Sequence, residues 1–170
     1  SAPTALASGF RLAKQLGKIP VVAGLCDGFI GNRILARYRE AADLLLLHGA
    51  TPAQIDKAMT GFGYAMGPYE AQDMSGLDIA FANRRRQDAS RDPNRTYVHI
   101  ADKMVEAGRL GRKTGLGWYS YANDGNAATD PLVDALIIAE ADHAGITRRH
   151  FSDNDIVKRL LLAMINEGAN

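Results

Sequence analysis

The longest helical pattern of apolar positions lies between residues 28 and 48. It follows a glycine-rich stretch, Asp27-Gly28-Phe29-Ile30-Gly31-Asn32-Arg33. Apolar side chains recur at intervals of three or four residues, at Ile30, Ile34, Leu35, Tyr38, Ala41, Ala42, Leu45 and Leu46. This spacing predicts a helix over residues 28–48. Asp27 suits its N-cap and Gly49 its C-terminal end, and we expect the chain to be organised around this helix.

One amide, Asn32, lies in the first two turns of this otherwise core-seeking helix. It has two interpretations. In the first, Asn32 is exposed or caps a neighbouring loop; in the second, it faces a substrate. Periodicity alone favours the exposed residue, because helices carry their polar side chains on the face away from the core.

A shorter helix and a strand-like run come before this stretch. Residues 5–17 carry a helical apolar pattern that Gly17 closes, and residues 18–23 read as a short buried strand. Pro20 restricts that strand to a sheet edge or to its own first residues. One helix and one strand cannot form a sheet. We therefore expect them to be the end of a domain whose other strands lie outside this sequence.

Helix start signals divide the rest of the chain. Thr51 is a predicted N-cap with Gln54 at capping-box spacing, opening a helix that ends before Gly61. Asp130 and Ser152 are predicted N-caps of two later helices. The pattern predicts helices over residues 68–75, 77–88, 97–107, 130–144 and from 152 onward, with a polar linker over 122–129. The run Arg84-Arg85-Arg86 is most simply a solvated face, with phosphate binding as a minor alternative.

A glycine-rich basic loop, residues 108–117, comes before the aromatic run Trp118-Tyr119-Ser120-Tyr121. Such loops can bring backbone N–H groups close to phosphate. The spacing is not that of a P-loop, and no helix follows. Alternatively, the glycines only make turns that fold the aromatic run, as a strand, against the helices. Both interpretations stay open at this point.

Composition excludes several classes of function. The length of 170 residues suits one domain, or one domain with fragments of others, and the net charge of +1 argues against a large nucleic-acid footprint. No apolar run approaches the roughly 18 residues that cross a bilayer, and no secretory signal is evident. The single cysteine, Cys26, excludes an internal disulfide and fits a reducing compartment. We expect no metal site, because the four histidines are scattered.

Three motifs together carry a family resemblance. Residues 28–33 resemble the pattern GF(I/V)xNR, residues 62–78 resemble FGxxMGPF–D–GLD, and residues 106–119 resemble GRxGxKTGxGWY. In their order and spacing, over residues 14–121, the chain resembles the C-terminal helical region of the 3-hydroxyacyl-CoA dehydrogenases, the NAD-dependent enzymes of fatty-acid β-oxidation. The resemblance implies an all-α fold like the C-terminal domain of 6-phosphogluconate dehydrogenase, with a residual N-terminal helix–strand from a missing Rossmann domain.

The C-terminal part narrows this resemblance. Residues 156–168 resemble the first helix of a second copy of the helical domain, and Arg159 occupies a place similar to that of Arg33. Such a second copy is found in the multifunctional enzymes that join an enoyl-CoA hydratase to this dehydrogenase. The implied divisions are the tail of the nucleotide-binding domain (1–26), the first helical domain (27–122), and a linker with the start of a second repeat (123–170).

The resemblance also implies roles. Asn32 matches the family's active-site asparagine, whose amide can donate to the substrate's 3-oxygen and steady a polarised carbonyl. Lys113 matches a lysine that reaches NAD, which it would contact as a point charge. The family's catalytic His–Glu pair lies in the nucleotide-binding domain, and none of the histidines here matches it. Without a GxGxxG motif, we do not expect NAD to bind this chain alone.

The remaining expectations concern partners and alternatives. The resemblance implies an acyl-CoA substrate and either a homodimer or intramolecular pairing of helical repeats, with residues 61–78 packing one helical domain against another. It implies a cytoplasmic location, or a peroxisomal one if the source is eukaryotic. Asp27 stands where the family often has proline, and Arg37 stands where several multifunctional relatives have a proline inside the helix. The alternatives are a non-catalytic helical assembly module, inactive alone, and, more weakly, a dehydrogenase of another β-hydroxyacid class.

Overall fold

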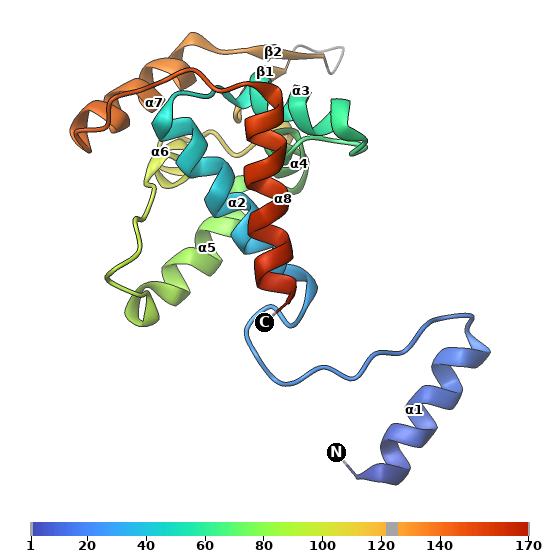
Figure 1. The fold of residues 1–170 in the computed structure, drawn as a ribbon. Helices are drawn as coiled ribbons and strands as arrows, with labels where there is room; N and C mark the ends of the chain where they lie inside the picture. Colours follow the sequence, from blue (N-terminus) through green and yellow to red (C-terminus); the bar gives the residue numbers. More distant parts are fainter. Residues whose placement is uncertain (1, 122–125, 170) are drawn as a thin grey trace. The chain divides into compact units, whose positions relative to one another are not determined.

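The structure, a computed structural model, describes residues 2–121 and 126–169, and these are mostly helical (Figure 1). The elements are α1 (Pro3–Gln15), α2 (Gly31–His48), α3 (Pro52–Phe62), α4 (Pro68–Ser75), α5 (Leu77–Gln87), η1 (Asp88–Ser90), α6 (Ile100–Glu106), η2 (Arg112–Thr114), β1 (Tyr119–Tyr121), β2 (Ala127–Thr129), α7 (Pro131–His143) and α8 (Asp153–Gly168). The chain forms two compact units, Ser1–Arg33 and Ile34–Asn170. Among the described residues, no helix combines the length and apolar character that a membrane span needs.

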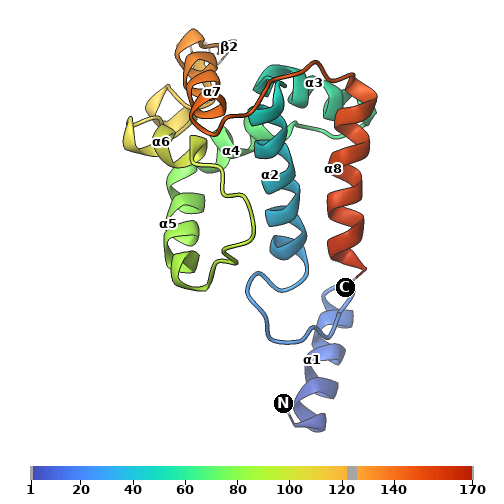
Figure 2. The same cartoon turned by 60° about the vertical axis from the view of Figure 1, so that its left-hand side comes forward.

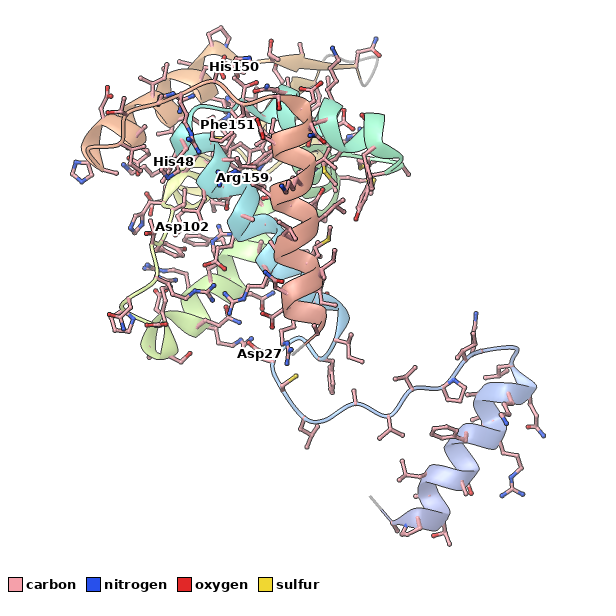
Figure 3. All side chains as sticks on the ribbon, viewed as in Figure 1. Asp27, His48, Asp102, His150, Phe151 and Arg159 are labelled. Carbon is pink, nitrogen blue, oxygen red and sulfur yellow. The ribbon has the colours of Figure 1, made fainter. Side chains whose placement is uncertain are left out.

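The first unit contains α1, which confirms the helix predicted over residues 5–17 with its start two residues earlier. The strand predicted over residues 18–23 is wrong: this segment is irregular, and Ile19 is 92% exposed. A strand needs a neighbour to accept its ladder hydrogen bonds, and the described part of the chain gives it none. Asp27 lies in the turn before α2 (Figure 3). Because α2 begins at Gly31 and not at residue 28, Asp27 is not at its N-cap position.

The second unit is built around α2, which stands between α5 and α8 in Figure 2. Its buried face carries Tyr38, Ala42, Leu45, Leu46 and Leu47. Helix α8 runs alongside α2 in the opposite direction in both ribbon views. Arg37 of α2 lies 3.1 Å from Glu167 near the end of α8 and 2.7 Å from Glu40. The central helix is therefore covered by an element more than 100 residues further along the chain.

The three N-caps predicted later in the chain, Thr51, Asp130 and Ser152, are confirmed. Thr51 accepts a hydrogen bond from the Gln54 N–H (3.2 Å), and Asp130 accepts one from the Leu132 N–H (3.0 Å). Ser152 forms a complete capping box with Asp155. The box predicted at Thr51 is only half formed, because the Gln54 amide instead donates to the carbonyl of Phe151 (2.8 Å).

The hydrogen bond from Gln54 to the Phe151 carbonyl joins α3 to the segment before α8. A residue of α8 also contacts the ring of Phe151. The Arg159 guanidinium lies 5.5 Å from the centre of this ring (Figure 3). Helix α3 continues to Phe62, two residues past its predicted end. Together these contacts fasten the C-terminal helix to the first half of the unit.

A short hairpin closes the fold. Strands β1 and β2 pair antiparallel, with Tyr119 opposite Thr129. The strand-like aromatic run is confirmed, whereas the linker predicted over 122–129 is wrong for residues 127–129; residues 122–125 lie outside the described residues. Trp118, which is 1% exposed, packs against Tyr69 of α4 with 4.6 Å between ring centres. The hairpin therefore joins the helical core through its aromatic side chains.

The run Arg84-Arg85-Arg86, predicted to be a solvated face, is only partly exposed. The Arg84 guanidinium is largely covered and donates to the Asp102 carboxylate (2.7 Å), which also accepts a hydrogen bond from the Tyr97 hydroxyl (2.5 Å). Helix α6, which carries Asp102, begins three residues later than predicted. One arginine of the run therefore joins α5 to α6 and is not a solvated side chain.

Candidate functional site

The turn before Asn32 has an unusual backbone. Gly28 has a φ of 77°, and a Cβ atom there would lie 2.9 Å from the backbone nitrogen of Arg33. Phe29 has a φ of 50°, which is uncommon for a bulky residue and indicates local strain. The N–H of Asn32 donates to the carbonyl of Gly28 (3.1 Å). This tight turn presents Asn32, an exposed residue, at the start of α2.

Lys113 lies in η2, within the glycine-rich loop. Its ammonium is 2.6 Å from the carboxylate of Asp78 at the start of α5. Both side chains remain accessible, with 48% of Lys113 and 42% of Asp78 exposed. The hydrogen bond from Lys113 holds the pKa of the Asp78 carboxyl below its usual value. The predicted cofactor lysine therefore has a defined carboxylate partner.

The loop around Lys113 is built on the carboxylate of Asp73, near the end of α4. This carboxylate accepts hydrogen bonds from the backbone N–H groups of Trp118 (2.9 Å) and Tyr119 (3.0 Å) and from the Tyr121 hydroxyl (2.8 Å). A Cβ atom at Gly117 would lie 2.1 Å from the same carboxylate. Asp73, which is 1% exposed, therefore fills the place of an anion inside the loop.

Three further N–H groups in this loop and the aromatic run after it are paired with nearby carbonyl groups. The N–H groups of Gly111 and Gly117 donate to Leu116 and Tyr119, each over 2.8 Å, and that of Tyr121 donates to Gly115 (2.9 Å). Donors that are already paired cannot cradle a phosphate without losing these bonds. The geometry therefore favours the interpretation in which the glycines make turns.

A second buried carboxylate, Asp56 of α3, caps α4. It accepts the N–H groups of Tyr69 and Glu70, each over 2.9 Å, and the Tyr119 hydroxyl (2.7 Å). An anion at a helix N-terminus pairs the orphan donors and favours the helix dipole. Burial raises the pKa of Asp56 to about 6, although these hydrogen bonds oppose the shift. Asp56 and Asp73 together link α3, α4 and the loop that carries Lys113.

Asp43 of α2 is a third covered carboxyl. It accepts a hydrogen bond from the Tyr69 hydroxyl (3.2 Å). Burial raises the pKa of Asp43 to about 7, while the guanidinium groups of Arg84 and Arg39 oppose the shift. Through Tyr69, this residue connects the central helix to the same helix, α4, that Asp56 caps.

The two predicted site residues belong to different compact units. Asn32 lies in the first and Lys113 in the second, so the structure describes each within its own surroundings. The sequence pointed to Asp73 and Asp78 as members of a family motif, but it did not point to Asp56. No local spacing identifies what these three carboxylates bind. In the described part of the chain, no group of three or more His, Cys, Asp or Glu side chains could hold a metal ion.

Comparison with known proteins places the chain in a class. The family model described as 3-hydroxyacyl-CoA dehydrogenase, C-terminal domain, matches residues 28–121, more than half of the sequence. The chain therefore belongs to this family, which confirms the resemblance seen in the three motifs.

More particular matches come from the multifunctional enzymes. The chain is 41% identical over 181 residues to the peroxisomal bifunctional enzyme of Danio rerio, covering 99% of this chain and 25% of that protein. It is 36% identical to the fatty acid oxidation complex subunit alpha of a Psychrobacter species, covering 98% of this chain and 24% of that protein. The chain thus spans about a quarter of the length of these relatives.

Solved structures of dehydrogenases resemble this chain in fold. The dehydrogenase part of multifunctional enzyme 1 from C. elegans is 31% identical, with a TM-score of 0.69 over 96% of this chain and 36% of that one. The 3-hydroxybutyryl-CoA dehydrogenase of Escherichia coli, at 21% identity, has a TM-score of 0.71 over 98% of this chain and 51% of that one. The second likeness shows the fold alone, and together with the family match it confirms the all-α prediction.

Proposed function

We propose that this chain is the helical portion of an NAD-dependent 3-hydroxyacyl-CoA dehydrogenase, which oxidises 3-hydroxyacyl-CoA to 3-oxoacyl-CoA in fatty-acid β-oxidation. One observation carries the proposal: the family match over residues 28–121 includes both Asn32 and Lys113. The names of the two curated relatives support the assignment to a multifunctional enzyme. The proposed location is peroxisomal for a eukaryotic source and cytoplasmic otherwise.

In this proposal, Asn32 acts on the substrate. Its amide N–H donates a hydrogen bond to the 3-oxygen, and this bond strengthens as the oxygen gains carbonyl character and negative charge. NAD, when bound, would supply the acceptor for the C3 hydride, and the hydroxyl proton would pass to a base in the nucleotide-binding domain. An exposed amide held at a helix start by a strained turn suits this role, because it is accessible and its backbone is fixed.

In the same proposal, Lys113 contacts the cofactor. Its ammonium is accessible and carries the charge that attracts an anionic dinucleotide. The sequence lacks a GxGxxG motif, so Lys113 would contribute one contact to a site formed mainly by another domain. The proposed divisions are the end of that nucleotide-binding domain (1–26), the first helical domain (27–122), and the linker and start of a second repeat (123–170).

The test is the dehydrogenase activity of the full-length parent on a 3-hydroxyacyl-CoA. Asn32→Ala should lower kcat by about 100- to 1,000-fold, as for other single donors to a developing oxyanion. Asn94→Ala, at another exposed asparagine, is the matched control and should retain activity. A parent without activity, or an Asn32→Ala variant with full activity, would contradict the proposal.

A second candidate is a helical assembly module without a residual substrate site. Two apolar side chains of α8, Leu162 and Ile165, remain exposed and favour this candidate, because a partner could cover them. Analytical sedimentation of the chain, with and without acyl-CoA, separates the two. A stable dimer that binds no acyl-CoA supports the assembly module, and a monomer that binds acyl-CoA supports the dehydrogenase portion.

A further inference from the structure

The ion pair between Lys113 and Asp78 joins two parts of the chain that are 35 residues apart. An exposed ion pair of this kind adds little to folding stability, because water screens it and both side chains lose freedom. A free lysine side chain, in contrast, samples many rotamers. The main physical effect of Asp78 is therefore to restrict where the Lys113 ammonium lies.

The chain makes room for this ion pair with a glycine. Gly76 has a φ of 93°, a conformation that other residues rarely adopt. A Cβ atom there would lie 2.7 Å from the Asp78 carboxylate and 3.2 Å from the Lys113 ammonium. Any larger residue at position 76 would press on both partners. The glycine, the carboxylate and the lysine therefore form one local arrangement.

The backbone on both sides of the ion pair is also fastened. The N–H of Leu77 donates to the carbonyl of Leu110 (3.3 Å), which joins the start of α5 to the loop. A Cβ atom at Gly111 would lie 2.3 Å from the carbonyl oxygen of Asp73, so the loop lies directly on the end of α4. Because these contacts fix the backbone on both sides, the conformation of the Lys113 side chain is what remains variable. The hydrogen bond to Asp78 restricts this conformation.

We propose that Asp78 is a positioning residue for Lys113, which it holds ready to meet an anionic dinucleotide. This inference rests on the proposed function, in which Lys113 contacts the cofactor. A side chain that is ordered before binding loses less entropy when the ligand arrives. Asp78 contributes to cofactor affinity through Lys113, and the effect disappears when Lys113 is removed.

A double-mutant cycle in the full-length parent tests this coupling. The four proteins are the parent, Asp78→Asn, Lys113→Met and the double variant. The measurements are the dissociation constant for NADH by calorimetry and the KM for NAD. We expect Asp78→Asn to raise both by about two- to fivefold, which corresponds to an exposed ion pair, with kcat unchanged. The double variant should match Lys113→Met.

Three outcomes would overturn the inference. If Asp78→Asn has the same effect with and without Lys113, its role is structural. If it leaves NADH binding unchanged or tightens it, Asp78 does not help Lys113. If Lys113→Met itself binds NADH normally, the role of Lys113 fails together with that of Asp78. The dehydrogenase assignment is tested separately, through Asn32→Ala, so these failures are distinguishable.

A matched control removes another exposed ion pair from the same region. Asp88 pairs with Arg91 (2.5 Å) and Arg85 (3.5 Å), and Asp88→Asn should leave NADH binding unchanged.

A second measurement uses the 170-residue chain itself and follows the carboxyl carbon resonance of Asp78 by NMR as the pH is changed. The pKa of the Asp78 carboxyl, followed through this resonance, should lie below its ordinary range and return toward that range in Lys113→Met. An unshifted resonance in both proteins would show that the ion pair does not form in solution.

Discussion

Asp73 and Asp78 are five residues apart, and both hold the glycine-rich loop, but they hold different parts of it. Asp73 is buried and accepts backbone N–H groups, so it determines the path of the main chain. Asp78 is accessible, and its carboxylate pairs with the end of one long side chain, that of Lys113. A buried carboxylate with several donors is costly to remove, whereas an exposed ion pair is not. The first therefore serves the fold, and the second can serve a ligand.

The largest expected effect comes from removing Asp73. In Asp73→Ala, two backbone N–H groups and one hydroxyl lose their acceptor inside the protein. We expect the free energy of unfolding of the chain to fall by about 3–5 kcal/mol, as when a buried charged partner is removed. Urea denaturation followed by circular dichroism measures it. The matched Asp78→Ala variant should unfold like the parent, and equal losses in the two variants would contradict the comparison.

The next effect is expected at Gly117, whose missing side chain leaves room for the Asp73 carboxylate. In Gly117→Ala the new methyl group would lie 2.1 Å from this carboxylate, so the loop must shift. We expect a loss of about 1–3 kcal/mol, as for other overpacked sites. Gly61→Ala is the control: nothing lies within 4 Å of that Cβ position in α3, and alanine should stabilise the helix. Similar stability for both variants would refute the close approach.

Asp43 extends the comparison to a carboxyl whose pKa is raised by burial to about 7. The folded chain then holds this proton more tightly than the unfolded chain does. Stability should therefore fall as pH rises from about 4 to 7, by roughly 1–2 kcal/mol when discounted for accessible water.

Denaturation between pH 4 and 8 measures this slope. Asp43→Asn should make it shallower, although Asp56, with a pKa raised to about 6, retains part of it. Asp134→Asn, at an exposed position of α7, should leave the slope unchanged. A slope of the opposite sign, or one indifferent to Asp43, would show that burial does not dominate at this carboxyl.

The smallest effect on stability is expected at Asp78. Asp78→Asn should leave the unfolding midpoint unchanged in urea, because both members of the ion pair remain accessible to water. Its consequence should appear only in dinucleotide binding by the parent. A marked loss of stability in Asp78→Asn would place this residue with Asp73 and remove the distinction between the two carboxylates.

Features that depend on neighbours in the sequence could be predicted. The caps at Thr51, Asp130 and Ser152 each bind an N–H group two or three residues ahead, so their residue types identify them. The helices follow from apolar spacing in the same way. The strand expected over residues 18–23 could not be judged in this way, because strands are stabilised by partners elsewhere in the chain.

Features that depend on distant partners could not be predicted. Trp118 and Tyr119 are 45 and 46 residues from Asp73, and nothing in their local pattern indicates that a carboxylate lies beneath them. Gln54 has capping-box spacing, yet its amide binds the Phe151 carbonyl 97 residues away. Asn32 and Lys113 were named through a family resemblance, so their roles stay predictions until the parent is assayed.

The antiparallel contact between α2 and α8 should not depend on the protein concentration. Because both helices belong to one chain, their association is intramolecular, and the Arg37–Glu167 pair forms at any protein concentration. A tether of this kind replaces a bimolecular equilibrium with a local concentration that is typically on the order of millimolar. Cleavage between α7 and α8 would turn the same contact into one that weakens as the sample is diluted.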